Sequence, residues 1–130
     1  MLLLKTSKDT LPKVIETSKH ALSARPDYSP GELALIAQTK EDLSPGEPPI
    51  RYRMEIARIY QDNGNESDQI WGKHWKYIVE GRNFLPLKNP FDISEVQVTG
   101  KNYVTGGTFF HIEKADAEAL MIGGWLDIAL

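Results

Sequence analysis

The 130-residue sequence contains no cysteine. Disulfide bonds, thiolate metal sites and catalytic thiols are therefore excluded, and the chain fits a reducing compartment, so we expect a cytoplasmic protein. The apolar run at the N-terminus, Leu2 to Leu4, stops at a lysine and is too short for a signal-peptide core or a membrane span. We expect no membrane partner.

An excess of positive charge is also lacking, because 15 basic residues stand against 18 acidic ones and give a formal net charge of −3. Non-specific binding along a phosphate backbone grows with the number of cations that a protein supplies. Any contact with nucleic acid must therefore be local. The candidate phosphate contacts fall in two clusters, namely Arg51 with Arg53, and Lys73 with Lys76. A solvated surface is the alternative explanation of both clusters.

Motifs for cofactor chemistry are missing as well. The sequence has neither the glycine fingerprint of dinucleotide-binding folds nor a phosphate-binding loop. Its histidines, His20, His74 and His111, lack the spacing of metal ligands, and a β-prone segment around His111 favours a packing role for that residue. We therefore expect no cofactor and no metal site.

The apolar pattern predicts mainly strands, within one domain over residues 1–130, a length near the commonest domain size. Alternation from Ile50 to Ile56 is typical of a half-buried antiparallel strand, whereas short continuous apolar runs indicate buried strands. Strands are expected at residues 2–4, 32–38, 50–60, 75–79 and 108–112, and helices at 10–20 and 113–121.

Four segments are expected to lack regular structure. Residues 40–49 hold three prolines, and residues 82–90 look like an irregular apolar corner because prolines interrupt them. Residues 61–69 are polar with a glycine, which predicts a mobile loop, and we place this loop at the border of a ligand site. Residues 100–107 form a further glycine-bearing loop.

Large aromatic residues are concentrated in the second half of the chain, next to lysines and arginines. Unstacked nucleic-acid bases bind by stacking on aromatic faces, with a few polar groups at the base edge. A hydrophobic core is the competing explanation for any one of them. Trp71 has less reason to be core, since it follows a polar segment. The set comprises Tyr52, Trp71, Trp75, Tyr77, Phe84, Phe109 and Phe110.

One local group of residues could support nucleophilic catalysis. A hydroxyl nucleophile needs a neighbouring base, and Lys5 beside Thr6 or Ser7 is the only such pairing that stands out. Capping of the helix that follows is the simpler explanation of these hydroxyls.

Four motifs together resemble the PUA-like superfamily, and within it the EVE domains, relatives of the YTH readers of methylated RNA. The first is an apolar strand that ends in Lys5, Thr6 and Ser7, and the second is a Pro-Gly turn at Pro30 into a buried strand. The others are a Phe-Leu-Pro-Leu corner at residues 84–87 and a Phe-Phe segment at 109–110 before a closing acidic helix.

This resemblance implies an α+β, PUA-like fold, with a mixed and mostly antiparallel curved sheet or partly open β-barrel and flanking helices. It also implies a pocket for a modified base, with Lys5, Thr6 and Ser7 along one side. By their chemistry, Trp71 and Trp75 are candidates for the stacking wall and Asn102 for the group that reads the base edge.

Three functions remain open at this point. The leading hypothesis is a module that binds DNA or RNA through a modified base, with a processing or restriction partner and no catalysis of its own. The second is a hydrolase of the ASCH type for small modified nucleosides, in which Lys5 activates Thr6 and a carboxylate such as Glu55 joins them. The third is a protein-interaction domain, which the absence of a pocket beside Trp71 would favour.

Overall fold

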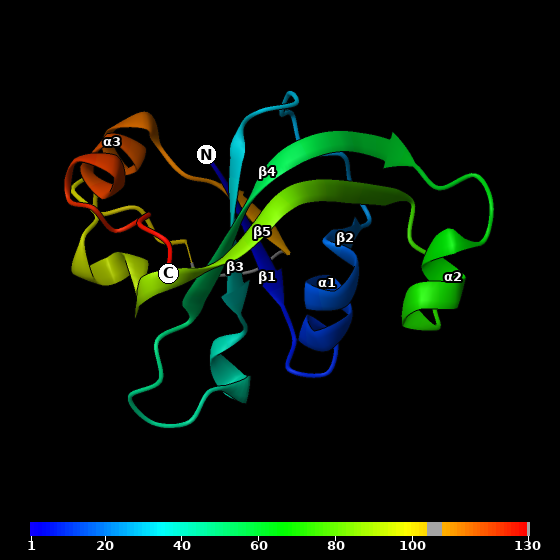
Figure 1. Ribbon diagram of the computed structural model, residues 1–130, viewed down its shortest axis with the longest axis horizontal. Coiled ribbons are helices and arrows are strands. Elements are labelled where there is room, and N and C mark those ends of the chain that lie inside the picture. The colour runs from blue at the N-terminus through cyan, green and yellow to red at the C-terminus, as the bar shows by residue number, and fades with distance from the viewer. Residues whose placement is uncertain (104–107, 130) are drawn as a thin grey trace.

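The computed structural model describes residues 1–103 and 108–129 as one curled sheet with helices on its faces (Figure 1). The helices are α1 (Leu11–Thr17), α2 (Glu66–Trp71) and α3 (Lys114–Ile122), and short 3-10 turns lie at η1 (Lys40–Asp42) and η2 (Ile93–Glu95). The strands are β1 (Leu2–Thr6), β2 (Lys19–Leu22), β3 (Leu33–Gln38), β4 (Ile50–Gln61), β5 (Tyr77–Phe91) and β6 (Phe109–His111).

The six strands follow the order β2-β5-β4-β3-β1-β6. Only the β1–β3 pair is parallel, and the other pairs are antiparallel. The long β4–β5 ladder changes register at three points, and such bulges bend a strand pair and increase its twist. The sheet therefore curls into a half-barrel, which confirms the predicted mixed, curved α+β fold.

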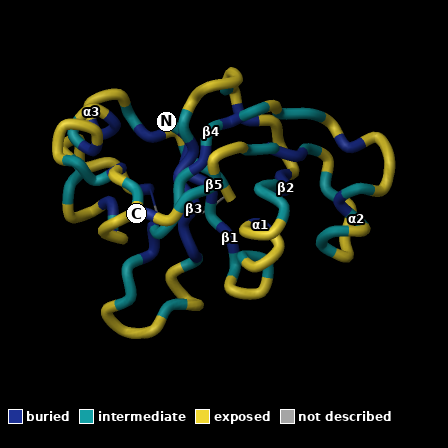
Figure 2. The backbone as a smooth tube through the Cα atoms, in the orientation of Figure 1, coloured by how far each residue is buried: buried dark blue, intermediate teal, exposed yellow. Residues whose placement is uncertain are grey.

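The centre of the sheet at β1 and β3 is buried on both faces, which explains the continuous apolar run at the N-terminus (Figure 2). Leu3 belongs to a cluster that includes Leu120 of α3, whereas Leu2 and Leu4 belong to a second cluster that includes Val14 of α1. Successive side chains of a strand point to opposite faces, so a run without polar residues indicates cover on both sides.

β2 is an element that the sequence pattern does not reveal. The helix predicted at residues 10–20 ends at Thr17, because Ser18 takes a left-handed conformation with φ 55° and its N–H closes the helix on Val14. The next four residues pair with β5, so that His20 lies opposite Val79 in the ladder. The prediction of a helix through His20 was wrong at its C-terminal end.

One predicted irregular segment is regular in the structure, and a second is regular in part. β5 continues through residues 82–90, and Pro86 sits where the ladder shifts register opposite Tyr52, so its missing N–H disturbs an already irregular pairing. The predicted mobile loop at 61–69 contains the start of α2, and its Asp62 is buried. Residues 62–65 thus form the predicted loop, residues 66–69 belong to α2, and the mobility of the segment stays a prediction.

The remaining expectations concern His111, the loop at residues 100–107 and the absence of a membrane span. His111 is exposed and hydrogen-bonds Tyr28 Oη at 2.5 Å, so the packing role was wrong. Residues 104–107 of the predicted glycine-bearing loop lie outside the described residues. None of the helices in the described part of the chain has the length and apolar character to cross a membrane.

Candidate functional site

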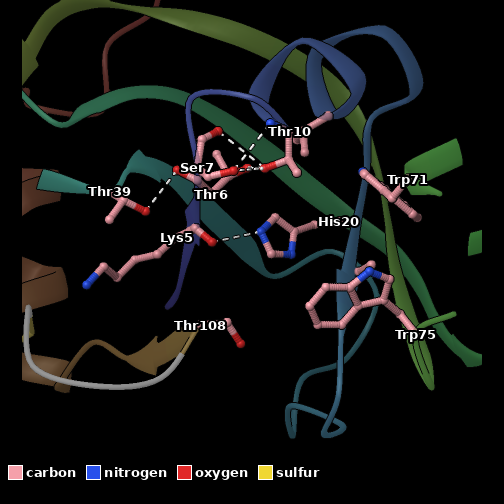
Figure 3. Close-up of a pocket in the computed structure, with 11 residues that line it drawn as sticks. Lys5, Thr6, Ser7, Thr10, His20, Thr39, Trp71, Trp75 and Thr108 are labelled. Carbon is pink, nitrogen blue, oxygen red and sulfur yellow. Dashed lines mark hydrogen bonds between the residues drawn. The ribbon is translucent and has the colours of Figure 1, made fainter. Parts of the chain in front are cut away.

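A cavity of about 280 Å³ lies between the end of β1, α1, β2 and the segment that joins α2 to β5 (Figure 3). Its wall combines hydroxyl groups, two indoles and one imidazole. The lining residues are Lys5, Thr6, Ser7, Thr10, Val14, His20, Ala21, Thr39, Trp71, Trp75 and Thr108.

The cavity brings together two groups of residues that the sequence predicted for a binding site. Lys5, Thr6 and Ser7 reach it from the end of β1, and Trp71 and Trp75 reach it from the opposite side. Asn102, the predicted reader of the base edge, is exposed and does not line it. The roles of these side chains in binding stay predictions.

Hydroxyl groups form a compact cluster at the turn between β1 and α1. The Thr10 hydroxyl lies 2.6 Å from that of Thr6 and 2.9 Å from that of Ser7. The Thr10 backbone N–H donates to Ser7 Oγ at 3.3 Å, as expected for a side chain that caps the turn before a helix. The N-cap of α1 is Thr10 and has no side-chain capping bond, so Ser7 closes this turn and does not cap the helix as predicted. Thr6, Ser7 and Thr10 all line the cavity.

Lys5 lines the cavity with part of its side chain, but its ammonium group lies elsewhere. Figure 3 shows the side chain extending away from the hydroxyl cluster, and Nζ lies 5.4 Å from the centroid of the Phe110 ring. The Thr6 carbonyl accepts a hydrogen bond from Thr39 Oγ1 at 3.2 Å, which ties β1 to the end of β3. The proposed activation of Thr6 by Lys5 is not assembled in this arrangement.

The two tryptophans are held by contacts of α2. Trp71 is the last residue of that helix, and Trp75 precedes β5; both are half-buried. Ser67 is fully buried, and its Oγ accepts a hydrogen bond from the Trp75 N–H at 2.8 Å and donates one to Asp62 at 2.6 Å. A buried hydroxyl with both partners satisfied fixes the backbone that carries Trp75.

A second set of contacts fastens α2 to the sheet. Glu66 receives hydrogen bonds from Lys19 at 2.5 Å and from the Tyr60 hydroxyl at 2.8 Å. Burial, together with this bond to Glu66, raises the pKa of Tyr60 to about 12, so the phenol remains a donor at neutral pH. The helix is thereby connected to β2 and β4, which positions Trp71 over the cavity.

His20 is a lining residue that the sequence pattern missed. It is only 5% exposed, and its Nε2–H donates to the Lys5 carbonyl at 3.0 Å. β1 and β2 are not neighbours in the strand order, so this bond joins two strands that meet because the sheet curls. No local signal in the sequence marks the contact, since β2 itself was unexpected.

Trp71 and Trp75 form the tryptophan wall of the cavity. Next to it, three possible metal ligands lie close together, although their spacing in the sequence did not predict a metal site. They are Asp62, Asp68 and His74. Their possible ligand atoms lie within 4.8 Å of one another, so they could hold a metal ion. Each already has a hydrogen-bond partner in the chain. Hydrogen bonds from Ser67 lower the pKa of Asp62 to about 2, and the hydrogen bond to Asp68 raises the pKa of His74.

The basic residues of β4 lie away from the cavity. Arg53 donates to the Leu126 carbonyl at 2.8 Å, and Arg51 pairs with Glu47 at 2.9 Å. Lys73 and Lys76 are exposed beside the tryptophan wall, with Lys73 Nζ 4.5 Å from the Trp75 ring. Of the two predicted phosphate-binding clusters, the lysine pair is thus the one near the cavity.

Carboxylates do not contribute to the described wall of the cavity. Glu55, which the hydrolase hypothesis requires, lies opposite Leu33 at the far end of β3 and accepts a hydrogen bond from Arg82 at 3.0 Å. Lys5 and Thr6 pair with the other end of β3. The three groups of that hypothesis do not converge.

Comparison with known proteins places the fold but gives no close relative. No protein-family model matches the chain, and no curated protein matches it. A crystal structure of ASCH from Zymomonas mobilis superposes with a TM-score of 0.63 at 9% identity, and the alignment covers 93% of each chain. Two mutant forms of that protein give TM-scores of 0.64 and 0.66 at 9% and 10% identity, with 93% of this chain and 96% and 94% of theirs covered. The chain therefore has the same fold as this ASCH protein.

Proposed function

We propose that the cavity binds a single base that a strand of DNA or RNA presents unstacked, and that the protein is a reader of modified bases. The observation that carries this proposal is the convergence of Trp71 and Trp75 with a hydroxyl cluster on one cavity of about 280 Å³. Pockets for drug-sized ligands occupy ~300–1,000 Å³, so this cavity suits one base better than several.

The chemistry of the wall supports base binding. Indole faces stack on bases irrespective of sequence, and hydroxyl groups can both donate to and accept from a base edge. Lys73 and Lys76 are exposed beside the indoles and can contact the phosphates that flank the bound base. A local lysine pair fits a chain whose net charge is −3.

A binding screen tests the proposal directly. Short single strands that each carry one methylated or hydroxymethylated base are titrated against the protein, with the unmodified strands as reference. We expect saturable binding with a preference for at least one modified strand, and loss of that preference in Trp71→Ala. Trp125→Ala is the matched control, because Trp125 packs on Phe91 instead of lining the cavity. Equal and weak binding of all strands contradicts the proposal.

The ASCH-type hydrolase is retained as a second candidate, because Lys5 and Thr6 do line the same cavity. The direction of Lys5 and the distant position of Glu55 favour binding over catalysis. Incubation with modified nucleosides and measurement of the released product separates the two candidates. Turnover that disappears in Thr6→Val, with binding retained, would make the chain an enzyme. The absence of a pocket beside Trp71 would have favoured a protein-interaction domain, but a cavity lies there.

A further inference from the structure

His20 lines the cavity, and one of its two ring nitrogens has no hydrogen-bond partner among the described residues. Its Nε2 lies 3.0 Å from the Lys5 carbonyl oxygen. A carbonyl only accepts hydrogen bonds, so Nε2 must carry the ring hydrogen. Figure 3 shows Nε2 turned toward that carbonyl and the other ring nitrogen turned away from it.

The second nitrogen, Nδ1, is therefore a lone-pair acceptor. Burial lowers the pKa of His20 to about 4, so the ring carries a single hydrogen at neutral pH. Nδ1 is buried and has no hydrogen-bond partner among the described residues. Buried polar atoms without a partner are rare and costly, which points to a group from outside the chain.

We infer that Nδ1 of His20 accepts a hydrogen bond from an N–H group on the edge of the bound base. The inference rests on the proposed function and names its ligand class, which is a base with an exocyclic amino group that keeps at least one hydrogen, as adenine, cytosine and guanine have. Monoalkylated amino groups satisfy this requirement. Dialkylated ones leave Nδ1 unpaired.

Trp71, Trp75 and His20 line the same cavity. Because Nδ1 is buried, a base reaches it only if a neighbouring side chain shifts, and a base that stacks on the half-buried indoles would also displace them. Binding should therefore change the tryptophan environment. Intrinsic fluorescence is accordingly a suitable signal for the titrations.

The decisive comparison uses two cytosine derivatives of equal size. N4-ethylcytosine keeps one hydrogen on N4. N4,N4-dimethylcytosine is its isomer, with the same number of atoms, and has no hydrogen on N4. Each is placed in the same short single strand, and N6-ethyladenine and N6,N6-dimethyladenine form a second pair. An unpaired buried acceptor costs enough to weaken binding of the dimethyl member about 5–150-fold.

Variants of His20 assign the preference to this residue. His20→Gln retains an amide donor for the Lys5 carbonyl and a carbonyl acceptor for the base, so the ethyl-over-dimethyl preference should persist. His20→Leu keeps apolar volume but lacks both groups, so the preference should vanish. Thermal unfolding checks the fold of each variant. If His20→Leu does not fold, the ¹⁵N chemical shift of Nδ1 in the wild-type protein decides, because accepting a hydrogen bond moves it upfield.

The possible failures are distinguishable. Absence of binding by any base overturns the proposed function and the inference with it. Binding with equal affinity for the ethyl and dimethyl members overturns the inference alone. A preference that survives in folded His20→Leu, or an Nδ1 shift that does not change on binding, also excludes His20 as the acceptor.

Discussion

Trp71 closes one side of the cavity from the last position of α2, and its half-buried side chain allows binding and stability to be separated. Trp71→Ala should weaken binding by ~1–3 kcal/mol, or about 5–150-fold, which is the stacking contribution of one base. Truncation of a fully buried tryptophan costs ~3–5 kcal/mol of stability, and we expect a smaller loss here. Affinity and melting temperature are measured on the same sample. Collapse of the fold with no specific effect on binding would identify Trp71 as a core residue.

Asp116 of α3 is fully buried and holds the segment before it through several hydrogen bonds. The Tyr103 hydroxyl donates to it at 2.5 Å, and the backbone N–H groups of Val98 and Thr99 donate at 2.7 and 3.0 Å. Asp116→Ala should destabilise the protein by ~2–3 kcal/mol, because it leaves these donors unpaired. Chemical denaturation measures the loss. Base affinity should remain unchanged in the folded variant, since Asp116 does not line the cavity.

Asp116 also predicts acid sensitivity with a definite sign. Burial raises its pKa, but the hydrogen bonds from Thr99 and Tyr103 outweigh burial and lower the pKa to about 2. The stabilisation is therefore complete above the ordinary pKa of 3.8 and is lost as the pH falls toward 2. Melting temperatures from pH 5 to 2 should fall less steeply in Asp116→Ala than in the wild type. Equal slopes would contradict the assignment.

His20 acts in a higher pH window. Its pKa falls from 6.5 to about 4 on burial, so the unfolded chain takes up a proton before the folded one does. Stability should be full above pH 6.5 and decrease as the pH falls toward 4. His20→Gln should flatten this part of the profile. His74, whose pKa is raised, acts in the opposite sense, and its contribution disappears as the pH rises.

At the scale of the elements, α2 matters because it carries the tryptophan wall. Ser67→Ala should cost ~1–3 kcal/mol of stability, since it leaves the buried Asp62 carboxylate without the Ser67 hydroxyl and the half-buried Trp75 N–H without its acceptor. It should also weaken base binding, because Trp75 is no longer fixed. The exposed Ser23 provides a matched control, and Ser23→Ala should change neither quantity. Stability that falls while affinity for the base holds would show that Ser67 supports the fold alone.

Local pattern revealed some elements and concealed others. The continuous apolar residues of β3 identify a strand that is buried on both faces. The alternation of apolar and polar residues in β4 identifies a strand that is buried on one face. β2 is a four-residue edge strand that follows a helix directly, and the left-handed Ser18 between them has no sequence marker as clear as glycine. α2 is short and polar, and only Ser67 in it is buried. Such elements depend on tertiary contacts.

At the scale of the whole molecule, the proposed nucleic-acid contact is tested by the positions of the basic residues. Lys73→Gln should lower affinity for modified and unmodified strands alike and reduce the salt dependence by about one phosphate contact. Arg53→Gln should leave the salt dependence unchanged, because Arg53 is bonded to the Leu126 carbonyl away from the cavity. Titrations at several salt concentrations compare the two. A reversed result would move the nucleic-acid path to β4.

The sequence by itself determined the α+β class, most of the strands and the kinds of side chain available for a site, because apolar periodicity and residue chemistry are local properties. Only the tertiary structure decided that Thr6 and Trp71 face one cavity, that Glu55 lies elsewhere, and that His20 reaches Lys5 across the gap of the half-barrel. These distances depend on how far the β4–β5 ladder bends at its register shifts. That bend sums small backbone deviations over a long strand pair, which no short stretch of sequence encodes.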